Sequence, residues 1–138
     1  MKYLLDVNVL VAWGWSDHTD HRRVVSWIAS VGSKDRLLTS AIPQLGFVRV
    51  SVQRTDGLIT VIEAGEVLGG MLSTLGNRHE FLPDDQASIR WPKWCASASS
   101  TTDAHLLQLA TTHGARLATL DTGIPTAFVL PKALPVGG

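Results

Sequence analysis

The chain has 138 residues, of which 45% are hydrophobic and 17% charged. This length suits one domain, and the composition is too apolar for intrinsic disorder. Twelve basic residues balance twelve acidic ones, so any contact with nucleic acid must be local rather than driven by net charge. The single cysteine, Cys95, excludes an internal disulfide and a zinc site made of several cysteines, and it suits a reducing compartment.

No apolar run approaches the roughly 18 residues that a membrane-spanning helix needs. Asp6 interrupts the apolar start of the chain too early for a signal peptide. We therefore expect a cytoplasmic protein without a membrane partner. We treat residues 1–138 as one domain, in which residues 131–138 form a flexible, Pro/Gly-rich tail.

Short apolar segments alternate with amphipathic ones along the chain. Strands are predicted over residues 3–5, 36–39, 80–83, 116–120 and 127–130. Helices are predicted over residues 7–15, 20–31, 40–52, 61–75 and 102–113, and residues 84–100 are the least regular stretch. This alternation predicts a three-layer α/β/α domain with a short, mostly parallel central sheet of four to five strands.

Two of the helices are predicted from apolar residues that share one face. Leu45, Val48 and Val52 fall on one face of the third helix, and a stripe of Val61, Gly65, Leu68 and Leu72 indicates the fourth.

Three aspartates fall where such a sheet exposes one edge. Asp6 closes the first strand, Asp121 closes the fourth, and Asp103 lies in the first turn of the helix between them. The carboxyl ends of parallel strands and the starts of the following helices meet at the same edge, where ligands bind. Taken singly, each aspartate has a plainer explanation as a helix cap or a turn residue.

Together, the three carboxylates favour a hard cation. Clustered negative charges repel each other, and oxygen ligands without cysteine indicate Mg²⁺ or Mn²⁺ rather than zinc. A carboxylate-bound Mg²⁺ keeps open water positions and is suited to hydrolysis at phosphorus.

Four blocks carry a resemblance to a known family. LLDVNVL (4–10), PQLGFVRV (43–50), TTDAHL (101–106) and LATLD (117–121) resemble the PIN-domain family, and within it the VapC-type toxins of bacterial toxin–antitoxin pairs. The blocks occur in the family's order over nearly the whole chain. The resemblance implies a PIN fold, Mg²⁺- or Mn²⁺-dependent cleavage of RNA, homodimerisation and a cognate antitoxin.

The resemblance also implies roles for individual residues. Asp6 and Asp103 would be the principal metal ligands, and Asp121 would ligate the metal or orient the cluster. Asn8 and Thr119 would form hydrogen bonds that steer the carboxylates.

One position departs from the family pattern. Gln44 stands near the start of the third helix, where the family has a catalytic glutamate. Glutamine keeps the shape and one acceptor oxygen, but it loses the charge and cannot act as a base. Either the natural site is weakened, or the residue is a change that silences a toxic enzyme.

Other side chains have two readings. His18 and His21 are expected at the surface, and His105 is expected to pack rather than to contact RNA. Trp13, Trp15 and Trp27 fit a core or an apolar groove for an antitoxin helix equally well.

Trp91 and Trp94 lie in the irregular stretch, and there they suit either stacking on bases or pinning of the loop.

Two further classes of protein compete with the nuclease. An aspartate-nucleophile phosphatase would want a second acid where Asn8 stands, and a phosphoacceptor domain would want a lysine earlier than Lys132. A catalytically silent PIN-type protein that binds RNA or an antitoxin remains the alternative, with Gln44 as its support.

Overall fold

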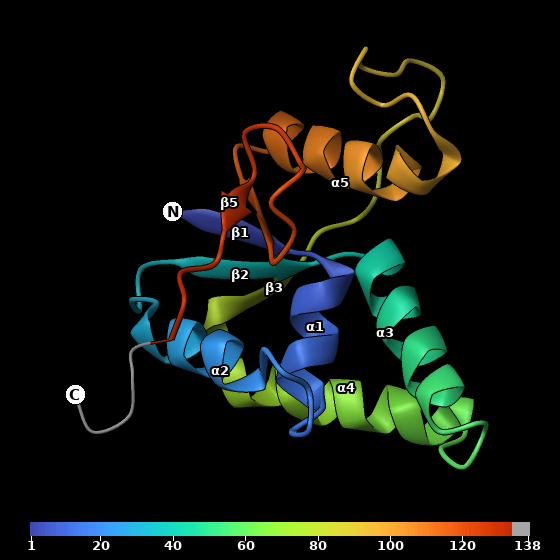
Figure 1. Cartoon of the computed structure of the whole chain (residues 1–138). Helices are drawn as coiled ribbons and strands as arrows, with labels where there is room; N and C mark the ends of the chain where they lie inside the picture. Colours follow the sequence, from blue (N-terminus) through green and yellow to red (C-terminus); the bar gives the residue numbers. More distant parts are fainter. Residues whose placement is uncertain (134–138) are drawn as a thin grey trace.

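The computed structural model describes residues 1–133, which are organised around one sheet (Figure 1). Its strands lie in the order β3-β2-β1-β4-β5, and every neighbouring pair is parallel. The parallel sheet predicted from the alternating pattern is therefore confirmed. The strands are β1 (Lys2–Leu5), β2 (Arg36–Thr39), β3 (His79–Phe81), β4 (Arg116–Thr119) and β5 (Phe128–Val129).

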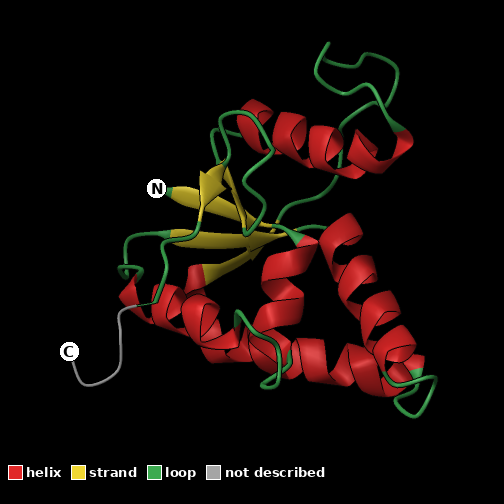
Figure 2. Ribbon diagram, in the orientation of Figure 1, coloured by secondary structure: helices red, strands yellow, loops and turns green. Residues whose placement is uncertain are grey.

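Helices cover both faces of the sheet, which gives the three predicted layers (Figure 2). Helix α5 lies on one face, and the other four lie on the opposite side. Two short 3-10 helices, η1 and η2, precede β3 and α5. The bounds are α1 (Val7–Gly14), α2 (His21–Ser30), α3 (Ala41–Arg54), α4 (Val61–Leu75), α5 (Thr101–Thr112), η1 (Gly76–Arg78) and η2 (Ala98–Ser100).

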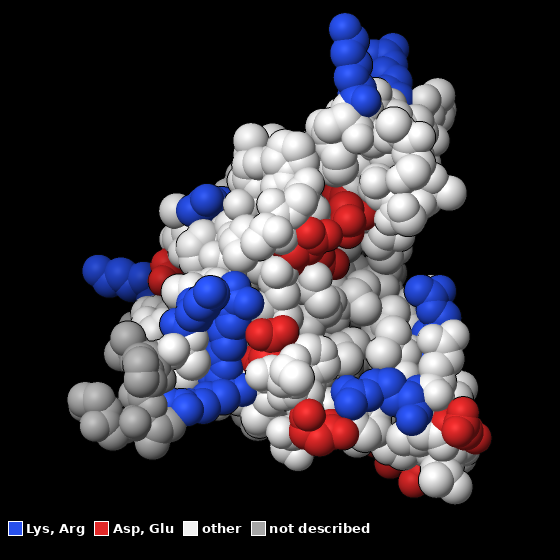
Figure 3. All heavy atoms as spheres, in the orientation of Figure 1, with Lys and Arg blue, Asp and Glu red and all other residues white. Residues whose placement is uncertain are grey.

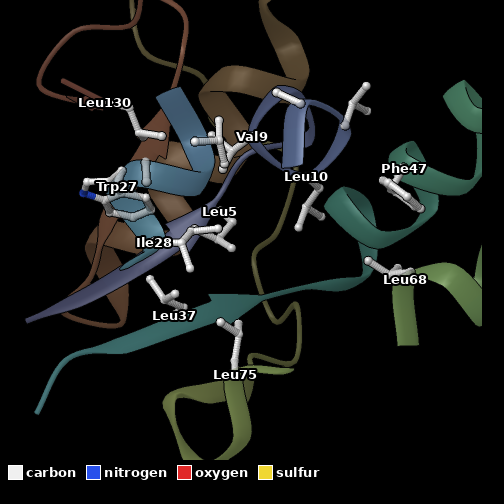
Figure 4. Packing of buried hydrophobic residues seen from close by; sticks show 14 residues of the cluster. Leu5, Val9, Leu10, Trp27, Ile28, Leu37, Phe47, Leu68, Leu75 and Leu130 are labelled. Carbon is white, nitrogen blue, oxygen red and sulfur yellow. The ribbon is translucent and has the colours of Figure 1, made fainter. Parts of the chain in front are cut away.

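The core is divided by the sheet into two clusters, because successive strand residues point to opposite faces. Leu5 packs with Trp27 and Phe47 on the side of α1 to α4, where Figure 4 shows the cluster. Leu4 packs with Leu106 on the side of α5. The central strand β1 is thus buried from both sides, which fixes the position of the residue that follows it.

The apolar faces predicted on α3 and α4 are only partly buried. Leu45 is 62% exposed, whereas Pro43, Phe47 and Ser51 are buried. Apolar residues occur around most of the circumference of α3, so their spacing does not select one face. In α4, Val61 is exposed and the buried residues are Ala64, Leu68 and Leu75.

Smaller differences concern the ends of elements. The third strand begins at His79 and ends at Phe81, so it starts one residue before the predicted range and Pro83 lies outside it. Of the predicted tail at 131–138, residues 134–138 lie outside the described residues. Within the described part, no helix is long and apolar enough to cross a membrane.

Candidate functional site: an acidic hollow at the carboxyl edge of the sheet

Asp6 lies at the junction of β1 and α1 and is almost fully buried. One carboxylate oxygen accepts a hydrogen bond of 2.7 Å from the backbone N–H of Val7 and so caps α1. The other accepts a bond of 2.8 Å from the hydroxyl of Thr119, at the end of the neighbouring strand β4. Asp6 is therefore both a helix cap and a fixed acidic group at the sheet edge.

Asn8 and Thr119 form a hydrogen-bonded network around this carboxylate. The Asn8 amide donates to the Thr119 hydroxyl oxygen at 3.2 Å, and its carbonyl oxygen accepts from the backbone N–H of Leu120 at 3.1 Å. The Thr119 oxygen also accepts from the backbone N–H of Asp121 at 3.1 Å. These bonds tie the start of α1 to the end of β4 and fix the orientation of Asp6.

Asp103 lies in the first turn of α5 and lines the same hollow as Asp6, which has a volume of about 390 Å³. Burial is the largest cause that raises the pKa of the Asp103 carboxyl, and together with the negative charges of Asp6 and Asp121 it brings this pKa to about 6. Within residues 1–133, the Asp103 carboxylate forms no ion pair or hydrogen bond with a side chain. Figure 3 shows acidic atoms gathered between α5 and the helical layer below it.

Burial also raises the pKa of Asp6, although the hydrogen bonds from Thr119 and Val7 oppose this effect. The charge of Asp121 raises it further. Asp121 itself is exposed, and one of its oxygens accepts a bond of 2.7 Å from the backbone N–H of Gly123. The three predicted acids thus influence each other electrostatically, with Asp6 and Asp103 in the hollow and Asp121 beside it.

The chemistry of these donors fits a hard divalent cation. All are carboxylate oxygens, and the charge on Asp103 lacks a cationic partner in the described chain. In the described residues, however, no three His, Cys, Asp or Glu side chains are close enough together to hold a metal ion. The arrangement is therefore a pair of acids in one hollow with a third at its rim.

Gln44 lies in the first turns of α3, half-buried, and its amide N–H donates to the Thr39 hydroxyl oxygen at 3.0 Å. Thr39 closes β2, so Gln44 is at the carboxyl edge, as predicted. Gln44 is not among the described residues that line the acidic hollow. The Thr39 hydroxyl also lies 2.7 Å from Nε2 of His79 on β3, and burial lowers the pKa of His79.

Two further residues line the hollow, and the sequence alone did not place them beside the acids. His18 lines it and is half-buried, so its predicted surface position is only partly correct. Arg49 is exposed on α3 and is the only arginine among the described residues that line the hollow.

The remaining side chains are now placed. His105 is buried and bonded through Nε2 to Asp84 at 2.7 Å, so the prediction that it packs is correct. Trp27 is core, whereas Trp13 and Trp15 are half-buried. The indole N–H of Trp15 donates to Ser51 at 3.0 Å, which joins α1 to α3.

The chain is an α/β protein in which an all-parallel sheet lies between helical layers. Aspartates from separate segments lie at the carboxyl edge of this sheet. The fold is similar to that in a crystal structure of VapBC2 from Rickettsia felis bound to a DNA fragment from their promoter. The TM-score is 0.55 at 15% identity, over 94% of this chain and 97% of the other.

The chain belongs to the PIN-domain family, whose model matches residues 3–127. It is similar to Ribonuclease VapC39 of Mycobacterium tuberculosis, with 35% identity over 90% of this chain and 91% of the relative. Ribonuclease VapC44 of the same organism is 39% identical over 94% of this chain and 92% of the relative. Ribonuclease VapC38, also of Mycobacterium tuberculosis, is 36% identical over 96% of this chain and 92% of the relative. The resemblance noted in the sequence is thus confirmed at the level of the family.

Proposed function

We propose that this protein is a metal-dependent endoribonuclease and the toxin of a VapBC-type toxin–antitoxin pair. The observation that carries the proposal is the half-buried Asp103, which lines one hollow with Asp6 and forms no ion pair within the described chain. RNA as the substrate is supported by two comparisons. The chain belongs to the PIN-domain family, and it is similar over most of its length to proteins named as ribonucleases.

Asp6 and Asp103 would hold Mg²⁺ or Mn²⁺, with Asp121 as a further ligand or an orienting charge. The bound ion would polarise a phosphoryl oxygen and lower the pKa of an attacking water. Thr119 and Asn8 keep the Asp6 carboxylate in a fixed orientation through the bonds described above. Arg49 at the rim offers a positive charge to a phosphate of the substrate.

Gln44 would attenuate this activity. A neutral amide is a poorer ligand for a hard cation than a carboxylate, and it cannot accept a proton from water. We expect the chain to bind Mg²⁺ weakly and to cleave RNA slowly.

The partners we propose are an RNA substrate, a cognate antitoxin and a second copy of this chain. Exposed apolar side chains at the turn between α3 and α4 support an association surface, namely Leu58 (86% exposed), Val61 and Ile62. Trp13 on α1 and Trp15, which follows the end of α1, are half-buried and support the helix-in-groove mode proposed for an antitoxin.

The test is cleavage of a mixed RNA pool by the parent protein and by Asp103→Asn, with Mg²⁺ or Mn²⁺ and then with a chelator. We expect metal-dependent cleavage by the parent and loss in the variant, with the fold preserved. Asp56→Asn is the matched control, because Asp56 is exposed in a turn with a positive φ that asparagine tolerates. Cleavage that persists in Asp103→Asn would reject the proposed site.

The alternative is a catalytically silent PIN-type protein that binds RNA or an antitoxin. The observation that favours it is the bond from Gln44 to Thr39, which only an amide or another donor can make in that direction. RNA binding without any cleavage, in the presence of saturating Mn²⁺, would favour this alternative.

A further inference from the structure

The long irregular segment before α5, residues 86–97, projects from the domain (Figure 1). We name it the α5 loop. It carries two cations, Arg90 and Lys93, and no acidic residue, although the whole chain has no net charge. Both cations are exposed, and neither forms an ion pair or hydrogen bond within the described residues 1–133.

The base of the α5 loop is fastened to α5 by polar contacts. His105 and His113 bond Asp84 and Asp85 at 2.7 and 2.8 Å. One residue further, the Gln86 amide donates to the side chain of Gln108 on α5 at 3.1 Å. The loop is therefore held in place over this helix.

Its two tryptophans differ in environment. Trp94 is half-buried and packs against the cluster under α5, so it pins the loop. Trp91 is 41% exposed and is not part of either core cluster among the described residues. Between the loop and α5 lies a hollow of about 580 Å³, lined by Trp94 and Arg90 from the loop and by Leu107 from the helix. An exposed ring beside unpaired cations is the combination that binds single-stranded nucleic acid, by stacking and by phosphate contacts.

The loop also leads directly to the acidic hollow. It runs through η2 into the start of α5, where Thr102 and Asp103 line that hollow. Figure 3 shows basic side chains projecting at the end of the molecule that the loop occupies, with the acidic atoms below them. A strand held along the loop would therefore approach the acids at the start of α5.

We infer that the α5 loop is a binding surface for single-stranded RNA, in which Trp91 stacks on a base while Arg90 and Lys93 contact phosphates. The inference rests on the proposed ribonuclease function for the choice of RNA as the ligand. Ile89 in the same loop is 84% exposed, and an exposed apolar side chain would also suit a protein partner. The two unpaired cations favour a polyanion instead.

The test measures binding of a fluorescein-labelled single-stranded RNA of mixed sequence, without divalent ions and with EDTA, so that cleavage plays no part. Trp91→Leu should weaken binding about tenfold, the scale of one lost base–ring stack. Trp91→Phe, the matched control, keeps a ring and should retain most of the affinity. Because Trp91 is exposed, both variants should unfold at the temperature of the parent.

The double variant Arg90→Gln, Lys93→Gln tests the phosphate contacts through their salt dependence. The slope of log affinity against log salt should become less steep by about 1.4, the value for two contacts to a single strand. The control is Lys2→Gln, Lys34→Gln, which removes two exposed cations near the opposite edge of the sheet and should leave the slope unchanged.

Unchanged affinity in Trp91→Leu together with an unchanged slope in the loop variant would overturn the inference, as would a parent that binds no RNA. Loss of RNA affinity in Ile89→Ala with Trp91→Leu unaffected would also overturn it, because the base would then not stack on Trp91. If the loop variants lose binding while the parent never cleaves RNA under any metal, the loop assignment stands and the ribonuclease proposal fails.

Discussion

Asp103 is a half-buried acid that forms no ion pair within the described chain. Its pKa rises from 3.8 to about 6 in the folded protein because the carboxyl is partly buried and lies near Asp6 and Asp121. Between these two pH values the folded state holds a proton that the unfolded state has released. The contribution of Asp103 to stability is therefore present at low pH and is lost as the pH rises towards about 6.

This sign leads to a prediction for Asp103→Asn. In EDTA the variant should be more stable than the parent near pH 7, whereas near pH 4 the two should have the same free energy of unfolding. Urea unfolding at the two pH values measures this difference. Mg²⁺ should then stabilise the parent but not the variant. An equal loss of stability at both pH values would instead make Asp103 a structural residue of the first turn of α5.

Gln44 is the second residue with a defined expectation. Gln44→Glu would place a negative charge near the carboxyl edge, and Thr39 would then have to donate its hydroxyl proton to residue 44 rather than accept from it. His79, 2.7 Å from Thr39, can supply the compensating N–H.

We expect Gln44→Glu to raise metal-dependent RNA cleavage by about 10²-fold or more, the scale of a positioned general base. Metal binding should tighten, and expression without the antitoxin should become toxic. Gln44→Leu is the matched comparison, since it fills similar space without any polar group. Unchanged cleavage and metal affinity in Gln44→Glu would show that position 44 lies outside the site.

At the scale of elements, the approach of α3 to α1 depends on Gly46. A Cβ at this position would lie 2.7 and 2.8 Å from the methyl carbons of Val7, the residue that follows Asp6. Helix α3 can therefore pack against the start of α1 only because residue 46 lacks a side chain.

We expect Gly46→Ala to lower the free energy of unfolding by about 1–3 kcal/mol, the usual cost of overpacking, although alanine favours the helix. Gly65→Ala on the exposed side of α4 is the control, because its Cβ meets nothing within 4 Å. It should stabilise the protein by up to about 1 kcal/mol. Denaturant unfolding measures the stability of both variants. If Gly46→Ala were as stable as the parent, α3 could move away from α1 without a cost in free energy.

Sequence reasoning succeeded where a physical rule limits the outcomes. Parallel strands place their carboxyl ends together, so the positions of Asp6 and Asp103 along one hollow are what the ends of the strands and the start of the helix predict. The role of Asp6, Asp103 and Asp121 as metal ligands stays a prediction. Sequence reasoning failed for α3, because apolar residues surround that helix and only the contact of Gly46 and Phe47 with α1 selects the buried face.

The hydrogen bonds of the site were less accessible still. The contact from Gln44 through Thr39 to His79 joins three elements, and no sequence spacing encodes it. The position of Arg49 in the lining of the hollow likewise depends on how α3 is rotated about its axis.

At the scale of the molecule, self-association is the prediction that the surface supports. The parent should sediment as a dimer at micromolar concentration, since isolated apolar patches of this kind usually mark an interface. Ile62→Glu, which puts a charge into the patch on α4, should shift the equilibrium towards monomer. A monomeric parent, or a dimer that Ile62→Glu leaves intact, would contradict a dimer formed through this patch.

The central claim is that Asp6 and Asp103 together hold a divalent cation, and direct titration with Mn²⁺ tests it even if Gln44 slows cleavage. Electron paramagnetic resonance distinguishes free from bound Mn²⁺ without any need for turnover. We predict saturable binding by the parent and its loss in Asp103→Asn, with binding unchanged in the Asp56→Asn control. Equal Mn²⁺ binding by the parent and Asp103→Asn, or no binding by either Gln44→Glu or the parent, would contradict the assignment of the acidic hollow as the metal centre.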